Sequence, residues 1–417
     1  MKTITPYFPF ILYILEGVNA LSFPNNQGPK RVCQTQQLPL NTFTKRSMMT
    51  RKRCIHGIAV AMVCSVPLLV EARPFGNQPA FAFNANADNL QGNNVEAPAS
   101  SAVAYKELKI KIPTFDVDVP VATWFPPTND EVEPTTVAYS HRISVKRIGT
   151  LLAGLDFIPD FVAKDFVLGP TTNAKTTSGE NMPYPNSPPV VLLAHGFLGS
   201  RFDLSHLAEA LAQQGFVCFC PEYPESLASS YAKKEGLDRS IINDYLLSTI
   251  KDDLGIKAKS YGIVGHSLGC GTATSTGDAS WTRVCIAGPP VRRDGVQLGS
   301  NTLAITSLND GLVTRSRLES MLPTDFVRLE EATLLDKPLP PKAVLIFDRD
   351  DGPNHISFLA GNVNDSMVSF LSPLLPVAQA LSIPVLDFDK YKISRDSVAT
   401  SNVVIPLVSS YLKQYMM

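Results

Sequence analysis

Short apolar runs and longer amphipathic segments alternate along the second half of this chain. Strands of four to eight residues are predicted at 190–194, 216–220, 261–264, 283–287, 303–310 and 343–347. Helices are predicted between or after them, at about 203–214, 240–251, 315–335 and 402–414. Strands that alternate with helices predict a parallel sheet with helices on both faces, which is an α/β fold.

The residues before this alternation form a less regular pattern. Two strands are predicted at 106–112 and 117–124, and the polar, proline-rich residues 171–189 predict an exposed loop. Between them lies an apolar insertion at about 137–168, whose apolar positions are spaced partly as in a helix. This insertion either forms a lid, faces a membrane or packs on the sheet, and the sequence leaves these alternatives open.

The strand at 261–264 leads directly into Gly265-His266-Ser267-Leu268-Gly269, the pattern Gly-x-Ser-x-Gly. Between a strand and a helix this pattern predicts a nucleophile elbow, a tight turn that holds its serine in a strained backbone conformation. Glycine is expected at both ends because a Cβ there would collide with the neighbouring strand or helix. Ser267 would then stand at a helix N-terminus, where negative charge is favoured. The alternative is a glycine-rich turn in a domain without catalytic activity.

A serine hydroxyl becomes a good nucleophile when a histidine takes its proton and a carboxylate orients that histidine. His355 is the one histidine that follows Ser267, and it lies in the loop after the strand at 343–347. Asp310 ends the preceding strand and is the favoured acid, although an Asn-Asp-Gly turn also fits its position. The rival carboxylates lie too near His355 in the chain for a good side-on pairing: Asp348, Asp350 and Asp351.

An ester hydrolase also needs two backbone N–H groups that point at the oxyanion. The first is predicted at Leu268, directly after the serine, and the second in the loop after the strand at 190–194. Phe197 is the favoured donor in that loop, with Leu198 as the alternative. His195 is expected to brace the loop rather than to act as a base.

From about residue 188 onward the chain resembles α/β-hydrolases. The segment His195-Gly196-Phe197-Leu198-Gly199, continued by 211–217 and 221–223, is similar to platelet-activating-factor acetylhydrolases, chlorophyllases and dienelactone-hydrolase-like enzymes. The resemblance implies antiparallel strands that open a mostly parallel sheet, and ester cleavage by a serine triad without a metal or organic cofactor. It matches Ser267 to the nucleophile, His355 to the base, and Phe197 and Leu268 to the oxyanion donors.

The chain departs from these families at two places. Chlorophyllases resemble one another in an arginine after the nucleophile, where this chain has Leu268. Acetylhydrolases and chlorophyllases have their aspartate after the strand that follows the elbow helix, but here that strand ends in Gly288-Pro289-Pro290. The acid is therefore expected one strand later, at Asp310, as in dienelactone hydrolases and many lipases.

Residues 1–87 have the composition of a targeting leader rather than of a folded domain. An apolar run at 7–15 precedes a small-residue cleavage site and Phe23, and no Asp or Glu occurs from 17 to 70 among seven basic residues. A second apolar run at 57–70 is too short to span a bilayer comfortably. This order resembles the leader of proteins sent to a secondary, red-lineage plastid, with a thylakoid-lumen transfer domain. The alternative is one uncleaved membrane anchor.

Removal of this leader changes the charge of the chain. It carries nine of the 37 basic and two of the 38 acidic residues, so residues 88–417 have a net charge of −8. Such an acidic domain is not expected to bind nucleic acid. Residues 88–417 are long enough for one domain with a large core. Free, buried thiols are predicted within it: Cys218, Cys220, Cys270 and Cys285.

These observations predict a serine carboxyl-ester hydrolase that works through an acyl-enzyme. The plastid leader favours an apolar small-molecule substrate, such as an acyl lipid, a chlorophyll phytyl ester or a carotenoid ester, and contact with the thylakoid membrane. Residues 227–237 and the turn at 289–299, with Arg292 and Arg293, are expected to border the site. Two alternatives remain open: an acyltransferase with the same triad, and a hydrolase-like binding protein without turnover.

Overall fold

The computed structural model describes most of the chain from residue 103 onward, all of it within one compact unit, residues 52–417. The described residues are 103–127, 137–144, 146–147, 166–173, 176–180, 182–290, 300–312, 316, 320–331, 337–361, 363 and 395–417. The predicted leader, 1–87, lies outside this part, as do Arg292 and Arg293 and most of the apolar insertion.

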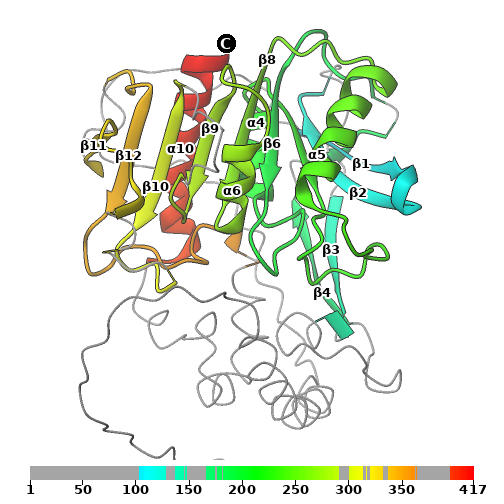
Figure 1. Ribbon diagram of the computed structural model, residues 1–417, viewed down its shortest axis with the longest axis horizontal. Coiled ribbons are helices and arrows are strands. Elements are labelled where there is room, and N and C mark those ends of the chain that lie inside the picture. The colour runs from blue at the N-terminus through cyan, green and yellow to red at the C-terminus, as the bar shows by residue number, and fades with distance from the viewer. Residues whose placement is uncertain are drawn as a thin grey trace, which may run out of the picture. The chain divides into compact units, whose positions relative to one another are not determined.

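A ten-stranded sheet forms the centre of this unit, in the order β11-β12-β10-β9-β8-β6-β7-β2-β1-β5 (Figure 1). Its strands are β1 (Val103–Ile112), β2 (Val117–Phe125), β5 (Thr176–Ser178), β6 (Pro189–Ala194), β7 (Val217–Pro221), β8 (Ser260–His266), β9 (Thr282–Ile286), β10 (Thr302–Ser307), β11 (Val327–Leu329) and β12 (Lys342–Phe347). The run from β7 to β11 is parallel, whereas β2 is antiparallel to both β1 and β7. The predicted pair of antiparallel opening strands is therefore confirmed.

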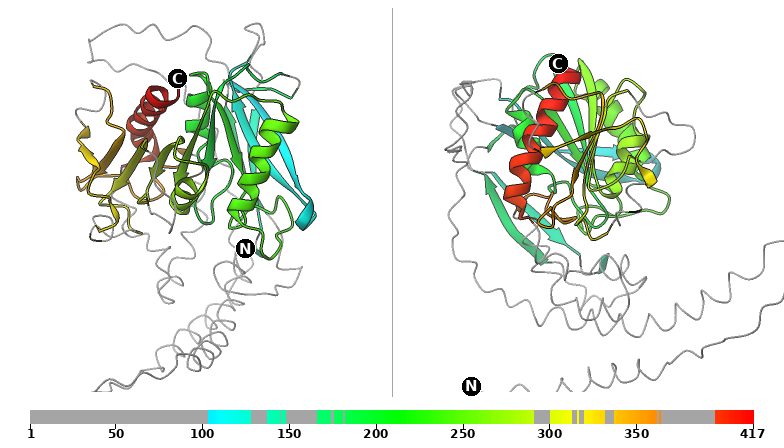
Figure 2. Two further views of the ribbon diagram at one scale, coloured as in Figure 1. Left: turned by 45° about the horizontal axis from the view of Figure 1, so that its top comes forward. Right: turned by 90° about the vertical axis from the view of Figure 1, so that its left-hand side faces the viewer.

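Helices cover both faces of the sheet (Figure 2). The described helices are α4 (Ser205–Ala212), α5 (Arg239–Ser248), its π-helical extension (Thr249–Asp253), α6 (Leu268–Ser275), α10 (Ser397–Met416) and a 3₁₀ turn (Pro113–Phe115). Apolar side chains of α4 and α10 share one core cluster, and those of α5 and α6 share the other. Within the described part of the chain, no helix combines the length and apolarity that crossing a membrane requires.

The central strands are buried on both faces, which explains their uninterrupted apolar sequences. In β6, Val190 and Leu192 pack in the cluster with α5 and α6, whereas Val191 and Leu193 pack in the cluster with α4 and α10. All four side chains are fully buried. Burial of apolar area of this extent on both sides of a strand is the main stabilising contribution to such a sheet.

Four strands depart from the sequence-based prediction. The helix predicted at 315–335 is wrong at Val327–Leu329, because β11 pairs with the open edge of β12. The exposed loop predicted at 171–189 is wrong at Thr176–Ser178, because β5 pairs with the edge of β1. The apolar insertion begins with β3 (Val137–Ile143) and runs into β4 (Phe166–Asn173), which together form a separate antiparallel pair. Residues 148–165, on which the lid and helix alternatives depend, lie outside the described part.

Candidate active site

Ser267 lies at a sharp turn between β8 and α6. Its backbone is in a strained conformation, with φ 55° and ψ −117°, which a non-glycine residue rarely adopts. The turn is held by hydrogen bonds from Ser267 N–H to the Ile286 carbonyl and from Cys270 N–H to the Ser267 carbonyl, both 2.9 Å long. A Cβ on Gly265 would overlap the Gly269 backbone, so the predicted glycine requirement holds at this position.

Gly269, at the other end of the turn, is packed as tightly against its neighbours as Gly265 is. A Cβ on Gly269 would overlap the carbonyl group of Ala194, the last residue of β6. The elbow helix therefore lies directly against the end of the neighbouring strand. This contact brings the N-terminus of α6 beside the loop that follows β6.

His355 connects Ser267 to Asp310 through hydrogen bonds on both ring nitrogens. Its Nε2 lies 2.7 Å from Ser267 Oγ, and its Nδ1 lies 3.0 and 2.9 Å from the two Asp310 carboxylate oxygens. Because the carboxylate only accepts, Nδ1 carries the proton and Nε2 is free to accept the serine proton. Asp310 and His355 are both buried, and Ser267 is half-buried. The structure thus brings His355 together with Ser267, 88 positions earlier in the chain, and with Asp310, 45 positions earlier.

The loop that carries His355 is held by hydrogen bonds that the sequence did not indicate. The side-chain oxygen of Asn354 accepts hydrogen bonds from the backbone N–H groups of Ile356 and Ser357, at 3.0 and 2.9 Å. His266 Nε2–H donates to the His355 carbonyl at 2.9 Å. Burial lowers the pKa of His266 to about 3, so this ring is neutral and keeps its proton on Nε2.

Two backbone N–H groups, one in the elbow and one in the loop after β6, have no acceptor among the described residues. Leu268 is the first residue of α6, so its N–H has no partner within the helix. The Phe197 N–H has no hydrogen-bond partner among the described residues. The Leu198 N–H, considered above as the alternative donor, is already engaged with the Glu225 carbonyl at 3.1 Å. Phe197 and Leu268 are therefore the pair that can bind an oxyanion.

Comparison with known proteins agrees with this topology. A family model described as the alpha/beta hydrolase fold matches residues 189–276, which run from β6 to the end of the elbow helix. The chain has the α/β-hydrolase fold. A search of curated proteins found no match.

Several solved structures of α/β-hydrolases are similar at low sequence identity. A ferulic acid esterase from Streptomyces cinnamoneus is 14% identical, over 76% of this chain and 92% of that one, with a TM-score of 0.42. An α/β serine hydrolase without a lid from Xanthomonas campestris is 13% identical, over 66% and 96%, with a TM-score of 0.36. A dienelactone hydrolase from Anabaena variabilis is 14% identical, over 64% and 94%, with a TM-score of 0.32.

In this α/β-hydrolase fold, His195 orients the peptide group that contributes the Phe197 N–H. His195 Nδ1–H donates to the Gly196 carbonyl at 2.8 Å, and its Nε2 accepts from the Tyr223 N–H at 2.9 Å. The carbonyl and N–H of a trans peptide point in opposite directions, so a bond to the Gly196 carbonyl sets the direction of the Phe197 N–H. Burial holds the pKa of His195 well below its usual range, which keeps the ring neutral. The bracing role predicted for His195 agrees with these contacts.

Arg239 on α5 ties the same loop to the elbow helix, a role that the sequence did not indicate. Its Nη1 donates to the His195 carbonyl at 2.8 Å and to Thr272 Oγ1 on α6 at 3.1 Å. Its Nε donates to a Glu225 carboxylate oxygen at 3.1 Å. One guanidinium therefore fixes the separation between the two elements that supply the Phe197 and Leu268 amides. No motif or periodicity marks an arginine that acts across such sequence distances.

Asp203 is a buried carboxyl group beneath the loop after β6. Its Oδ1 accepts from the N–H and the hydroxyl of Ser200, at 3.0 and 3.1 Å, and its backbone carbonyl accepts from Ala360 N–H at 2.9 Å. Burial is the largest influence on this group and raises the pKa of Asp203 from 3.8 to about 7. Asp203 thus links the oxyanion loop to the segment after His355 and titrates near neutral pH.

The raised pKa of Asp203 predicts a specific pH dependence of stability. Between pH 4 and 7 the folded protein keeps a proton that the unfolded chain has lost, so this group lowers the free energy of unfolding as the pH rises. Asp203→Asn retains an oxygen for Ser200 and cannot ionise. The variant should therefore gain stability relative to wild type between pH 5 and 8, by about 3 kcal/mol. Urea unfolding at both pH values measures the difference, and an equal difference at both would contradict it.

The described residues contain no group of three or more His, Cys, Asp or Glu side chains that could hold a metal ion. The four predicted thiols are free and buried, as expected: Cys218, Cys220, Cys270 and Cys285. Burial raises the pKa of Cys270 well above its usual range, so this neighbour of the serine is a neutral thiol. Its Sγ lies 3.3 Å from both the Gly265 and the Ile286 carbonyl oxygens, which adds to the packing of the elbow.

Proposed function

We propose that this protein is a serine hydrolase that cleaves carboxyl esters through an acyl-enzyme. The observation that carries the proposal is the continuous hydrogen-bonded path from Asp310 through His355 to Ser267 Oγ, with 2.9 and 2.7 Å steps. The strained serine at the N-terminus of α6 and the two unengaged amides beside it support the same chemistry.

In the proposed reaction, Ser267 Oγ attacks the ester carbonyl carbon while His355 Nε2 takes its proton. The Asp310 carboxylate, hydrogen-bonded to Nδ1, stabilises the resulting imidazolium. The Phe197 and Leu268 amides bind the oxyanion of the tetrahedral intermediate, which collapses as His355 returns the proton to the leaving alcohol. Water then attacks the acyl-enzyme by the same route, and the carboxylic acid is released with Ser267 restored.

An apolar substrate in a plastid is the finer part of this proposal. Phe197 and Leu268 are exposed large apolar side chains, at 39% and 44%; Leu268 directly follows Ser267, and Phe197 directly follows Gly196, which lies against Ser267. Such exposed apolar surface beside a nucleophile favours a lipid or pigment ester. The acid-free, basic composition of residues 17–70 supports delivery of the following domain to a plastid, near the thylakoid membrane.

A fluorophosphonate probe tests the proposal directly, because it reacts with activated serines. We expect one equivalent of probe on the peptide that contains Ser267, together with hydrolysis of acyl lipid, phytyl or carotenoid esters by the same protein. Labelling without hydrolysis, but with transfer to an added alcohol, would favour an acyltransferase. Absence of labelling would leave a binding protein without turnover and would overturn the proposal.

A further inference from the structure

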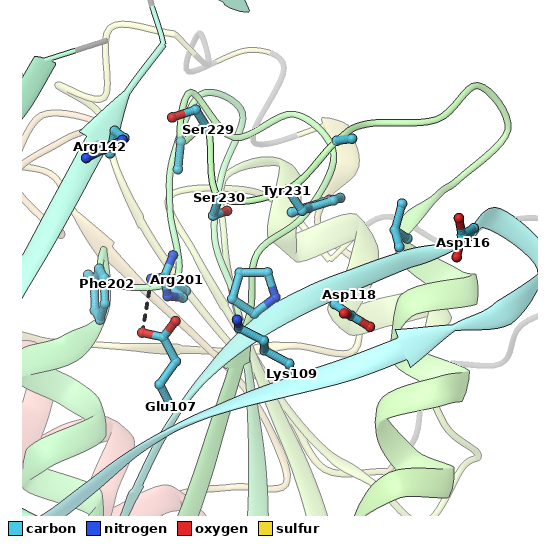
Figure 3. A pocket seen from close by; sticks show the side chains of 14 residues that line it. Glu107, Lys109, Asp116, Asp118, Arg142, Arg201, Phe202, Ser229, Ser230 and Tyr231 are labelled. Carbon is cyan, nitrogen blue, oxygen red and sulfur yellow. Dashed lines mark hydrogen bonds and ion pairs between the residues drawn. The ribbon is translucent and has the colours of Figure 1, made fainter.

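A cavity of about 500 Å³ opens beside the β1–β2 hairpin, away from the residues of the proposed active site. It lies between this hairpin, Arg142 of β3 and the segment 228–232 (Figure 3). Neither Ser267, Asp310 and His355 nor the two oxyanion donors contribute to its lining. Residues 228–232, which the sequence placed beside the ester site, line this second cavity.

The floor of the cavity is a fixed arginine. Arg201 is 9% exposed and donates to the buried Glu222 at 2.7 Å and to Glu107 of β1 at 3.2 Å. Its guanidinium also lies 4.5 Å from the centre of the Phe202 ring. Tyr231, on the opposite wall, donates from its hydroxyl to the Glu222 carbonyl at 3.0 Å. These contacts tie the floor of the cavity to β1 and to Glu222, which directly follows β7.

The rim of the cavity carries charges that the floor does not neutralise. Four exposed side chains of the lining have no ion-pair partner among the described residues: Lys109, Asp116, Asp118 and Arg142. With Glu107 and Arg201, the lining holds three cations and three carboxylates. The formal charge of the lining is therefore zero, although the rim has both cations and carboxylates without an ion-pair partner.

The two arginines of the lining lie apart from its two aspartates, and Lys109 lies beside Asp118 (Figure 3). Figure 3 shows Arg142 and Arg201 toward one end of the cavity, and Asp116 and Asp118 toward the other. The strand register agrees, since Glu107 lies opposite Ala122 and Asp118 lies opposite Lys111, four residues farther along β1. At about 3.3 Å per residue, Glu107, the partner of Arg201, and Asp118 are roughly 13 Å apart along the hairpin.

We propose that this cavity binds a small zwitterion, with its carboxylate at Arg142 and its ammonium group at Asp116 and Asp118. An anion alone would leave the two aspartates unpaired, and a cation alone would leave Arg142 and Lys109 unpaired. A zwitterion pairs both ends, and its charges cancel those of the rim without adding net charge to an acidic domain. An extended peptide of three residues spans about 10 Å, which suits the separation after the rim side chains reach inward.

Three peptides that differ only in their end charges test the proposal: triglycine, N-acetyltriglycine and triglycinamide. Calorimetric titration of the wild-type protein at low ionic strength should show binding of triglycine at least about tenfold tighter than of either blocked peptide. Arg142→Gln and Asp118→Asn should each weaken triglycine about tenfold. Lys413→Gln, a charge change at an exposed lysine of α10 outside the lining, should leave its affinity unchanged.

Each other result decides against the proposal. If N-acetyltriglycine bound as tightly as triglycine, the cavity would be an anion site. If triglycinamide bound as tightly as triglycine, it would be a cation site. Absence of triglycine binding at about 10 mM would show that the cavity is not a zwitterion site. Loss of triglycine binding after fluorophosphonate treatment would assign the peptide to the serine site instead. Thermal unfolding of each variant excludes misfolding as a cause. Ester hydrolysis is measured separately, so failure here leaves the proposed hydrolase unaffected.

Discussion

Replacing Ser267 with alanine should reduce kcat for ester substrates by about 10⁴- to 10⁶-fold without disrupting the fold. The variant lacks the oxygen that lies 2.7 Å from His355 Nε2, so no acyl-enzyme can form. The backbone requirements of the turn are unchanged, because alanine has the same Cβ as serine and the turn is held by main-chain hydrogen bonds. Initial rates on one ester, and the temperature of unfolding, measure the two halves of this prediction.

Ser275→Ala is the matched control, because it removes a hydroxyl from the same helix. Ser275 Oγ donates to the Gly271 carbonyl at 2.8 Å, within α6. We expect this variant to keep its esterase activity within about a factor of two and to lose little stability. If Ser267→Ala retained more than about 1% of wild-type kcat, the proposed nucleophile would be wrong.

The parallel half of the fold was predictable because each strand is buried on both faces. Continuous apolar runs such as Val190–Ala194 leave no other environment for their side chains, so the strand positions follow from the sequence alone. The short edge strands were not predictable in this way. Val327 and Arg328 are exposed, and β11 exists because β12 offers unpaired backbone groups, which is a property of the assembled sheet.

The same distinction holds for the candidate site. Ser267, Asp310 and His355 each follow a parallel strand, and the carboxyl ends of such strands meet at one edge of the sheet, so sequence order indicated their convergence. The side chains of Arg239 and His266 support that site through hydrogen bonds to main-chain groups far away in the chain, and Asp203 supports it through its own main-chain carbonyl, which accepts from Ala360 N–H. Main-chain acceptors are present at every residue, so nothing in the sequence marks which of them a given side chain will find.

Replacing Asp310 with asparagine should lower kcat by about 10³- to 10⁴-fold, the second largest effect that we expect. The Leu312 N–H donates to Asp310 Oδ1 at 3.1 Å and would keep the amide oxygen of the asparagine on that side. The amide NH₂ group would then face His355 Nδ1 from the position of Oδ2, 2.9 Å away. His355 would hold its proton on Nε2 and could no longer accept the proton of Ser267.

Asp351→Asn is the control that separates this explanation from a general loss of charge near His355. Asp351 lies four residues before His355, but its side chain is 69% exposed and pairs only with Arg349 among the described residues, at 3.4 Å. We expect wild-type kcat and wild-type rates of fluorophosphonate labelling from this variant, since an exposed ion pair contributes little. Equal losses in the two variants would show that the activity depends on negative charge near His355 rather than on the tautomer that Asp310 sets. A loss confined to Asp310→Asn, with unchanged thermal unfolding, requires that the tautomer of His355 limits the reaction.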